Sequence, residues 1–262
     1  MPMRPNRTKA LLREGKIALG ISHSQIRSAE IPRMFAAAGL DWIFIDSEHG
    51  PFTPETLQDV VQGCLQTPLT PFVRVSDFQY SLVARALDIG AEGLILPRVE
   101  DPEVLKNAVS WAKFPPKGVR GFGLGAPQIG YDNAPFDQVI PHLNDELLIA
   151  AQIESRVGLD RCDEIIAVEG ADILLVGPAD LSISLGVAGQ WEHPDLIAAI
   201  SRVVEACDKH GKWAAIQTRT TALAERCMEL GVKLVSSGNE LALLWGATAK
   251  TASELKAARD RN

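Results

Sequence analysis

The sequence predicts an α/β protein, a single (β/α)₈ barrel over residues 1–262. The length fits one barrel of about 250 residues, or two small domains. Short apolar runs alternate with longer amphipathic stretches, an order typical of a parallel sheet covered by helices. No Gly-x-Gly-x-x-Gly motif follows the first apolar run, so a closed barrel is favoured over an open, doubly wound sheet.

Eight apolar segments are candidate strands, because each is short and bounded by polar or turn-forming residues. In chain order they are Ile17–Ile21, Trp42–Ile45, Pro71–Val75, Gly93–Leu96, Leu147–Ile153, Ile173–Val176, Trp213–Gln217 and Leu234–Ser236. Between them, apolar residues recur at spacings of three and four, as at Leu196, Ile200 and Val203, which predicts helices.

Helix boundaries and the longest loop can also be placed. Thr53-Pro54 and Asp101-Pro102 each have the pattern of an N-cap followed by proline at the first helical position. The segment Lys113–Leu143 is rich in glycine and proline and is expected to be the longest irregular piece. The last segment, Glu240–Arg261, is a good helix former that extends past the barrel, so we expect it to pack on another subunit.

Composition excludes several classes of protein. The formal net charge is -7 and no basic stripe is present, which argues against a nucleic-acid partner. The beginning of the sequence has no apolar signal region, and no run of 18 apolar residues could span a membrane. We therefore expect a cytoplasmic protein. The four cysteines are widely spaced without a Cys-x-x-Cys pair, which argues against a cysteine zinc site and suits a reducing compartment.

The carboxyl ends of the strands carry the candidate chemistry, because catalytic residues of this fold gather at that face. Glu154 follows the fifth predicted strand and Asp180 follows the sixth. Two carboxylates from adjacent strand ends suit a hard divalent cation such as Mg²⁺ or Mn²⁺. The alternative is that each acid is only a helix cap or an ion-pair partner.

A histidine and an arginine complete this set. His49 lies three residues after Asp46, which could fix its tautomer, and histidine suits proton transfer near neutral pH. Arg74 ends the third strand and could neutralise a developing enolate. The alternatives are a surface histidine and a rim ion pair. Arg98 is a weaker candidate for the role of Arg74, and His23 is a weaker candidate for the role of His49.

Substrate contacts and the mode of activation follow from two further observations. The turn Gly177–Ser182 opens a helix whose free N–H groups can hold a carboxylate, which makes Ala179, Asp180 and Ser182 candidate substrate contacts. A Schiff-base aldolase needs a lysine in the barrel mouth. Lys16 and Lys233 precede strands and so fall at the opposite face, which favours metal over imine activation.

With these residues in place, the sequence resembles the HpcH/HpaI aldolase/citrate lyase family, specifically its class II, metal-dependent pyruvate aldolases. The resemblance runs from about Leu11 to Leu244. It rests on five stretches that are specific in combination: Ala38–Pro51, Leu96–Val99, Gly118–Gly121, Gln152–Ser155 and Val176–Ser182. Two stretches depart from the family pattern, Ser22-His23-Ser24 and Gly123–Tyr131, and both bear on the identity of the acceptor.

The resemblance implies a role for each matching residue. Glu154 and Asp180 match the ligands of a divalent metal ion, Mg²⁺, Mn²⁺ or Co²⁺. His49 matches the base, paired with Asp46, and Arg74 matches the residue that steadies the keto oxygen. Gln152 matches a donor-site residue, and the amides around Ala179 and Asp180 match the pyruvate carboxylate cradle. The resemblance also implies a homohexamer, a trimer of dimers, whose subunits exchange the C-terminal helix.

The expected activity is reversible aldol cleavage of 4-hydroxy-2-oxo acids to pyruvate, or to a close 2-oxo acid such as hydroxypyruvate, and an aldehyde. One rival is a citrate-synthase-like or CoA-thioester lyase on the same scaffold, although no clear basic pocket for a CoA tail is evident. Another is a non-catalytic barrel that binds a 2-oxo acid. The combination of base, arginine and carboxylates argues against mere binding, which needs no base.

Overall fold

The computed structural model describes residues 3–123, 129, 131 and 134–261. Its parallel strands close into a barrel in the order in which they occur along the chain, and β8 pairs back with β1. The predicted (β/α)₈ fold is thus confirmed, and each strand overlaps the segment predicted for it. The strands are β1 (Ala18–His23), β2 (Trp42–Asp46), β3 (Thr70–Arg74), β4 (Gly93–Leu96), β5 (Leu148–Ile153), β6 (Ile173–Val176), β7 (Trp213–Thr218) and β8 (Leu234–Asn239).

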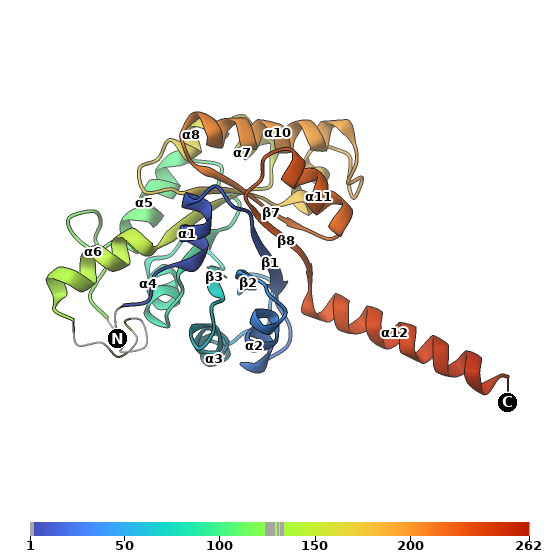
Figure 1. Ribbon diagram of the computed structural model, residues 1–262. Helices are drawn as coiled ribbons and strands as arrows, with labels where there is room; N and C mark the ends of the chain where they lie inside the picture. Colours follow the sequence, from blue (N-terminus) through green and yellow to red (C-terminus); the bar gives the residue numbers. More distant parts are fainter. Residues whose placement is uncertain (1–2, 124–128, 130, 132–133, 262) are drawn as a thin grey trace.

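Apart from the first and the last, the helices connect the strands and cover the outside of the barrel (Figure 1). They are α1 (Arg7–Arg13), α2 (Glu30–Ala37), α3 (Pro54–Leu65), α4 (Tyr80–Asp88), α5 (Pro102–Ala112), α6 (Phe136–Glu146), α7 (Arg156–Asp160), α8 (Cys162–Ile166), α9 (Pro178–Ser184), α10 (Pro194–Lys209), α11 (Thr221–Glu229) and α12 (Glu240–Arg259). The side chains of Thr53 and Asp101 accept the N–H groups of Thr56 and Glu103, which confirms both predicted N-caps.

One expectation about the long connection before β5 was wrong. The segment Lys113–Leu143 is not irregular throughout, because α6 begins at Phe136 inside it. The proline-rich composition concealed this helix, which contains Pro141 in its interior. Most of the unusual stretch Gly123–Tyr131 lies outside the described residues.

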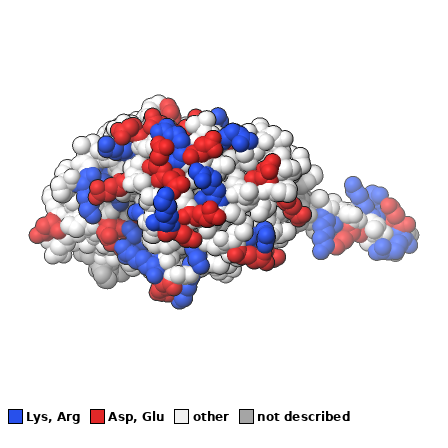
Figure 2. All heavy atoms as spheres, turned by 90° about the horizontal axis from the view of Figure 1, so that it is seen from above, with Lys and Arg blue, Asp and Glu red and all other residues white. Residues whose placement is uncertain are grey.

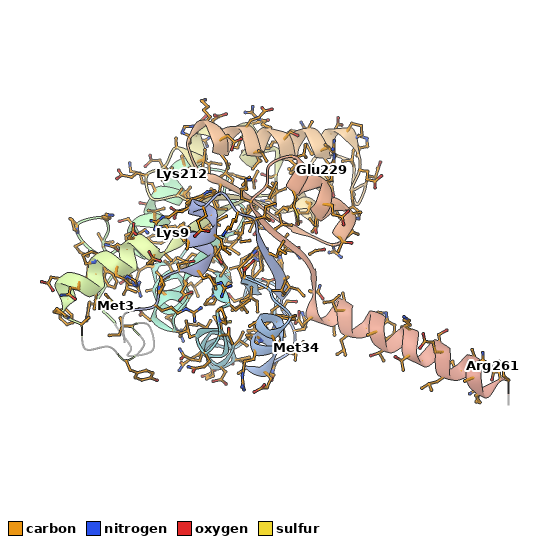
Figure 3. All side chains as sticks on the ribbon, viewed as in Figure 1. Met3, Lys9, Met34, Lys212, Glu229 and Arg261 are labelled. Carbon is orange, nitrogen blue, oxygen red and sulfur yellow. The ribbon has the colours of Figure 1, made fainter. Side chains whose placement is uncertain are left out.

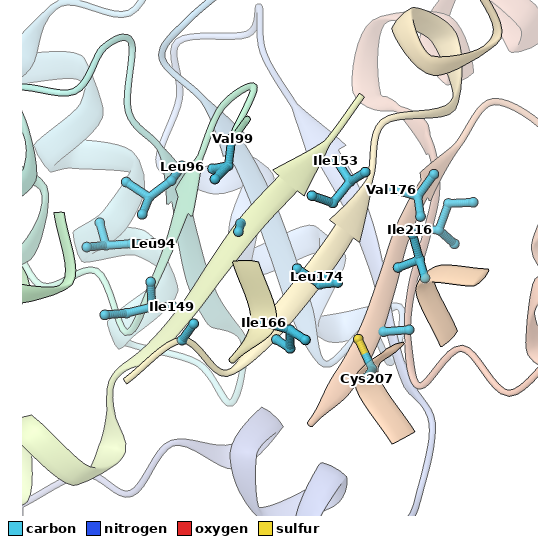
Figure 4. Close-up of a cluster of buried hydrophobic side chains, with 14 of the residues drawn as sticks. Leu94, Leu96, Val99, Ile149, Ile153, Ile166, Leu174, Val176, Cys207 and Ile216 are labelled. Carbon is cyan, nitrogen blue, oxygen red and sulfur yellow. The ribbon is translucent and has the colours of Figure 1, made fainter. Parts of the chain in front are cut away.

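Alternation along the strands divides the apolar side chains into two layers. One layer fills the bore and includes Trp42, Phe44, Phe72, Ile95 and Leu175. The other lies between the strands and the helices, where Figure 4 shows Ile153, Val176 and Ile216. Adjacent residues of one strand therefore belong to opposite layers. This rule fixes which residues at each strand end face the mouth.

The amino-terminal end of the barrel is closed by α1. Leu12 of this helix packs into the bore cluster, and Figure 3 shows Lys9 on the same helix beside the barrel. The Arg4 guanidinium forms an ion pair of 2.8 Å with Glu92 and donates to the carbonyl oxygens of Leu65 and Thr67. The segment that precedes α1 is thus bound to the amino-terminal end of the barrel.

The last helix, α12, projects away from the barrel, and Figure 3 places Arg261 at its far end. Leu241, Leu244 and Trp245 are 47%, 54% and 71% exposed. On the face seen in Figure 2, Lys, Arg, Asp and Glu side chains are intermingled rather than gathered into a stripe of one sign. No helix in the described part of the chain is long and apolar enough to cross a membrane.

Candidate active site

Polar side chains gather where β2, β3 and β5 end. Because Phe44, Phe72 and Ala150 belong to the bore layer, the residues two positions further along face the mouth of the barrel. These residues are Asp46, Arg74 and Gln152, and Glu154 follows by the same alternation. The structure therefore brings together at one mouth four of the residues expected to carry the chemistry.

Arg74 is held by two carboxylates. Its Nε and one terminal nitrogen bind the two oxygens of Asp46 at 3.0 and 2.6 Å, and its other terminal nitrogen lies 2.9 Å from Glu48. Its guanidinium also lies 5.1 Å from the centre of the Phe44 ring. A planar guanidinium fixed in this way presents its charge in a defined place at the mouth. Glu48 stood in the recognised motif, but its contact with Arg74 was not predicted.

Glu154 is a buried carboxylate in a crowded, negatively charged setting. It accepts hydrogen bonds from the Arg98 backbone N–H at 2.9 Å and from Gln152 Nε2 at 2.6 Å. Burial raises the pKa of Glu154; Arg74 opposes the rise, while Asp180 and Glu48 add to it. Charging Glu154 is thus unfavourable even beside Arg74, and a further cation would offset this, so the setting fits a divalent ion.

The oxygen donors present fit a divalent metal ion. Glu154 and Asp180 supply hard oxygen atoms from adjacent strand ends, which is the donor type that Mg²⁺ and Mn²⁺ prefer. A Cβ atom at Gly177 would come within 2.8 Å of both Gln152 Nε2 and Glu154 Oε2, so glycine is needed for these two side chains to take their positions. The described residues contain no group of three or more His, Cys, Asp or Glu side chains arranged to hold a metal. Water or substrate would have to complete the coordination.

His49 lies at the mouth but is not bound as expected. Its side chain is 69% exposed, with Nε2 3.7 Å from Glu48. Asp46 accepts the backbone N–H of His49 at 3.1 Å instead of engaging the ring. The expected hydrogen bond between Asp46 and the imidazole is therefore corrected: this carboxylate shapes the loop and binds Arg74. The exposed imidazole is left free to meet a substrate.

The three candidate substrate contacts in the turn after β6 differ in how exposed they are. Ala179 is half-buried and Asp180 is exposed at the start of α9, where either can meet a ligand. Ser182 is fully buried; its hydroxyl donates to the Ala179 carbonyl at 2.7 Å and accepts the Gly189 N–H at 3.1 Å. Because this hydroxyl already serves the fold, we remove Ser182 from the expected substrate contacts.

The two weaker candidates have other roles. Arg98 adopts a left-handed backbone conformation with φ 43°, and its backbone rather than its side chain reaches Glu154. His23 is fully buried against Phe35 and Phe52, with Nδ1 3.3 Å from Glu240. His23 therefore joins the end of β1 to the start of α12. Neither arrangement could be read from residue type, because both depend on tertiary contacts.

Comparisons with known proteins identify the family of the chain. The model of the HpcH/HpaI aldolase/citrate lyase family matches residues 23–247. The chain is 33% identical to 5-keto-4-deoxy-D-glucarate aldolase of Shigella boydii, covering 98% of both chains. It is 34% identical to 4-hydroxy-2-oxo-heptane-1,7-dioate aldolase of Escherichia coli, covering 91% of this chain and 90% of that one.

Solved structures give the same result. An HpcH/HpaI aldolase from Desulfitobacterium hafniense superposes with a TM-score of 0.90 at 32% identity, covering 95% of this chain and 96% of the other. The citrate synthase SbnG superposes with a TM-score of 0.86 at 26% identity, covering 96% and 98%. The resemblance predicted from the motifs is thus confirmed, with aldolases at higher identity than this citrate synthase.

Proposed function

The chain belongs to the HpcH/HpaI aldolase/citrate lyase family, and from this premise we propose that it is a class II pyruvate aldolase dependent on a divalent metal ion. Its aldolase relatives, at 33% and 34% identity, indicate that it is a carbon–carbon lyase. The proposed reaction is reversible cleavage of 4-hydroxy-2-oxo acids to an aldehyde and pyruvate, or a close 2-oxo acid. The observation that carries the proposal is Arg74, fixed by Asp46 and Glu48 beside the buried Glu154.

Each residue of the mouth has a place in this reaction. Arg74 stabilises the negative charge that develops on the keto oxygen when the enolate forms. Asp46 and Glu48 hold its guanidinium, so that it need not reorganise during the reaction. The exposed His49 takes the proton from the 4-hydroxyl as the bond between C3 and C4 breaks. Ala179 and Asp180 lie where backbone N–H groups can receive the substrate carboxylate.

Glu154 and Asp180 would hold the metal ion, which when bound supplies a Lewis acid that polarises the substrate carbonyl. Gln152 donates to Glu154 and fixes the direction of its carboxylate. Mg²⁺, Mn²⁺ and Co²⁺ are the proposed ions. No lysine side chain is needed in this scheme.

The citrate-synthase-like activity is the second candidate. It is favoured by the structural likeness to the citrate synthase SbnG. It is the weaker candidate because the aldolase relatives share more of the sequence. We further propose a cytoplasmic homohexamer, a trimer of dimers, in which α12 with its exposed Leu244 and Trp245 is exchanged between subunits.

Removal of metal tests the proposal. EDTA should abolish aldol cleavage, and Mg²⁺, Mn²⁺ or Co²⁺ should restore it. Glu154→Gln and Asp180→Asn should weaken binding of Mn²⁺ measured by calorimetry, whereas Glu205→Gln on α10 serves as a matched control and should not. Full activity in a chelated, metal-free sample would contradict the class II assignment, and borohydride trapping of a substrate on lysine would support imine chemistry.

A further inference from the structure

The ends of β7 and β8 carry no charge on their bore-facing side chains. Ala215 and Leu234 belong to the bore layer, whereas Ile216 and Val235 belong to the outer layer. Alternation therefore turns Gln217 of β7 toward the bore. The same alternation applies to Ser236 of β8, and Figure 4 shows Ile216, the neighbour of Gln217, in the outer layer. None of the expected site residues lies on these two strands.

Gln217 presents a hydrogen-bond acceptor. Its Nε2 donates to the carbonyl oxygens of Thr218 and Gly238, each at 3.1 Å. Because both partners can only accept, they fix the orientation of the amide and turn Oε1 away from them. Within the described residues Oε1 has no hydrogen-bond partner. The side chain is only partly buried, so a substrate can reach it.

Ser236 presents a hydroxyl beside that acceptor. It pairs with Gln217 in the register of β7 and β8, and neighbouring strands lie about 4.8 Å apart. Ser236 is fully buried, and its Oγ has no hydrogen-bond partner among the residues that the structure describes. A buried hydroxyl without a partner is unfavourable, and this points to a ligand that completes the hydrogen bond.

These two side chains face the proposed chemistry. In an eight-stranded closed barrel, β7 lies across the bore from β3, which carries Arg74. Ile153 pairs with Val176, and Val176 pairs with Ile216. The residues that follow them, Glu154, Gly177 and Gln217, therefore lie side by side in this order. Gly177 has no side chain, so no side chain from this position stands between Glu154 and Gln217.

We propose that Gln217 and Ser236 bind a hydroxyl group of the substrate, so that the enzyme selects hydroxylated over unhydroxylated substrates. A hydroxyl can donate to Gln217 Oε1 and accept from Ser236 Oγ, whereas a methyl group can do neither. A second carboxylate would find no cation in this pair. The hydroxyl can belong to the 2-oxo acid, as in hydroxypyruvate, or to the aldehyde. The inference rests on the proposed aldolase function and adds its substrate class.

The test compares matched substrates in the condensation direction with protein supplied with Mn²⁺. Pyruvate with acetaldehyde is the unhydroxylated pair; hydroxypyruvate with acetaldehyde and pyruvate with glycolaldehyde each add one hydroxyl. The wild-type protein should prefer one hydroxylated pair in kcat/KM. Gln217→Leu and Ser236→Ala should each lower that preference by about threefold to tenfold, the contribution of one hydrogen bond. Ser237→Ala, on the same strand but facing outward, should leave the preference unchanged.

The outcomes separate the two proposals. Loss of preference with hydroxypyruvate assigns the hydroxyl to the 2-oxo acid, and loss with glycolaldehyde assigns it to the aldehyde. Equal losses on all pairs, or unchanged ratios, would overturn the inference and leave the aldolase function standing. If no pair reacts, the proposed function fails; calorimetric binding of hydroxypyruvate against pyruvate to wild-type protein and Gln217→Leu then decides, and equal affinity ratios overturn the inference.

Discussion

Arg74 and His49 differ in how the protein holds them. The Arg74 guanidinium is fixed by Asp46 and Glu48, whereas the His49 side chain is 69% exposed. A fixed cation suits stabilisation of an enolate, which must not wait for the side chain to reorganise. A free imidazole suits proton exchange with a substrate hydroxyl and with water. The two residues should therefore fail in different ways when they are replaced.

His49→Ala should lower kcat for aldol cleavage by about 10²- to 10⁴-fold, the usual contribution of a positioned base. Decarboxylation of oxaloacetate passes through the same pyruvate enolate but removes no proton from a 4-hydroxyl. It should therefore be much less affected. Steady-state rates of both reactions measure this, with His210→Ala, a distant histidine on the outer surface, as the matched control. Equal damage to both reactions would show that His49 is not the base.

Replacement of Arg74 should impair both reactions, because both form the enolate. Arg74→Lys keeps the positive charge but loses the planar fork that binds Asp46 at two points. It is preferable to Arg74→Ala, which would leave two carboxylates without their cation. A variant that loses aldol cleavage alone would contradict the assigned role.

The C-terminal helix is anchored at its start and unsupported along its length. Glu240 Oε1 accepts the N–H groups of Ser24 at 2.9 Å, Gln25 at 2.5 Å and Ile26 at 3.1 Å. Burial acts to raise the pKa of Glu240, but the neighbouring His23 side chain and the N–H groups of Ser24 and Gln25 outweigh it and lower the pKa to about 2. Beyond this anchor, Leu241, Leu244 and Trp245 are exposed at a spacing that places them on one face.

We expect that face to be buried against another subunit. Leu244→Glu combined with Trp245→Glu should lower the mass measured by light scattering, because charges would enter an apolar interface. The substitutions spare Glu240, so the anchor on the barrel is kept. Lys250→Glu combined with Thr251→Glu, on the same helix, is the control and should keep the wild-type mass. A monomeric wild-type protein, or an unchanged mass in the first variant, would contradict the exchange of α12.

Among the elements, the strands could be predicted from the sequence, whereas α6 and the burial of His23 could not. Apolar runs such as Gly93–Leu96 and Ile173–Val176 match β4 and β6 residue for residue, because buried parallel strands are continuously apolar. The helix from Phe136 was missed because its neighbourhood is rich in glycine and proline. The burial of His23 depends on Phe35 and Phe52, which no local pattern connects to it.

The site could be predicted only in part, because some of its contacts depend on the fold and not on local sequence. The strand-end rule found Arg74 and Glu154, since it needs only the order of the strands. It did not find Gln217 or Ser236, because the bore-facing residue of each strand is known only from the register. Nor could it show that Asp46 binds Arg74 rather than the His49 ring.

A largely buried acid, Glu92, lies at the face of the barrel opposite the mouth, with its side chain 16% exposed. Burial raises the pKa of Glu92 to about 7; Arg4 opposes the rise and Glu146 adds to it. The folded protein thus keeps a proton that the unfolded chain releases above its ordinary pKa of 4.5. This contribution to stability is complete below pH 4.5 and is lost as the pH rises through about 7.

Glu92→Gln should remove this dependence while keeping an oxygen for Arg4. The free energy of unfolding of the variant, relative to wild type, should rise as the pH increases from 5 to about 8. Urea denaturation at several pH values measures it. The difference between the two proteins is informative because all other titrations are shared. A difference that stays constant with pH would contradict a raised pKa for Glu92.

The most direct test of the account is release of a 2-oxo acid from a series of 4-hydroxy-2-oxo acids, followed with lactate dehydrogenase and NADH in the presence of Mg²⁺, Mn²⁺ or Co²⁺. We predict release from at least one member of the series, lost with EDTA and strongly reduced in Arg74→Lys. No release from any member, together with consumption of oxaloacetate and acetyl-CoA, would contradict the aldolase function and support the citrate-synthase-like alternative.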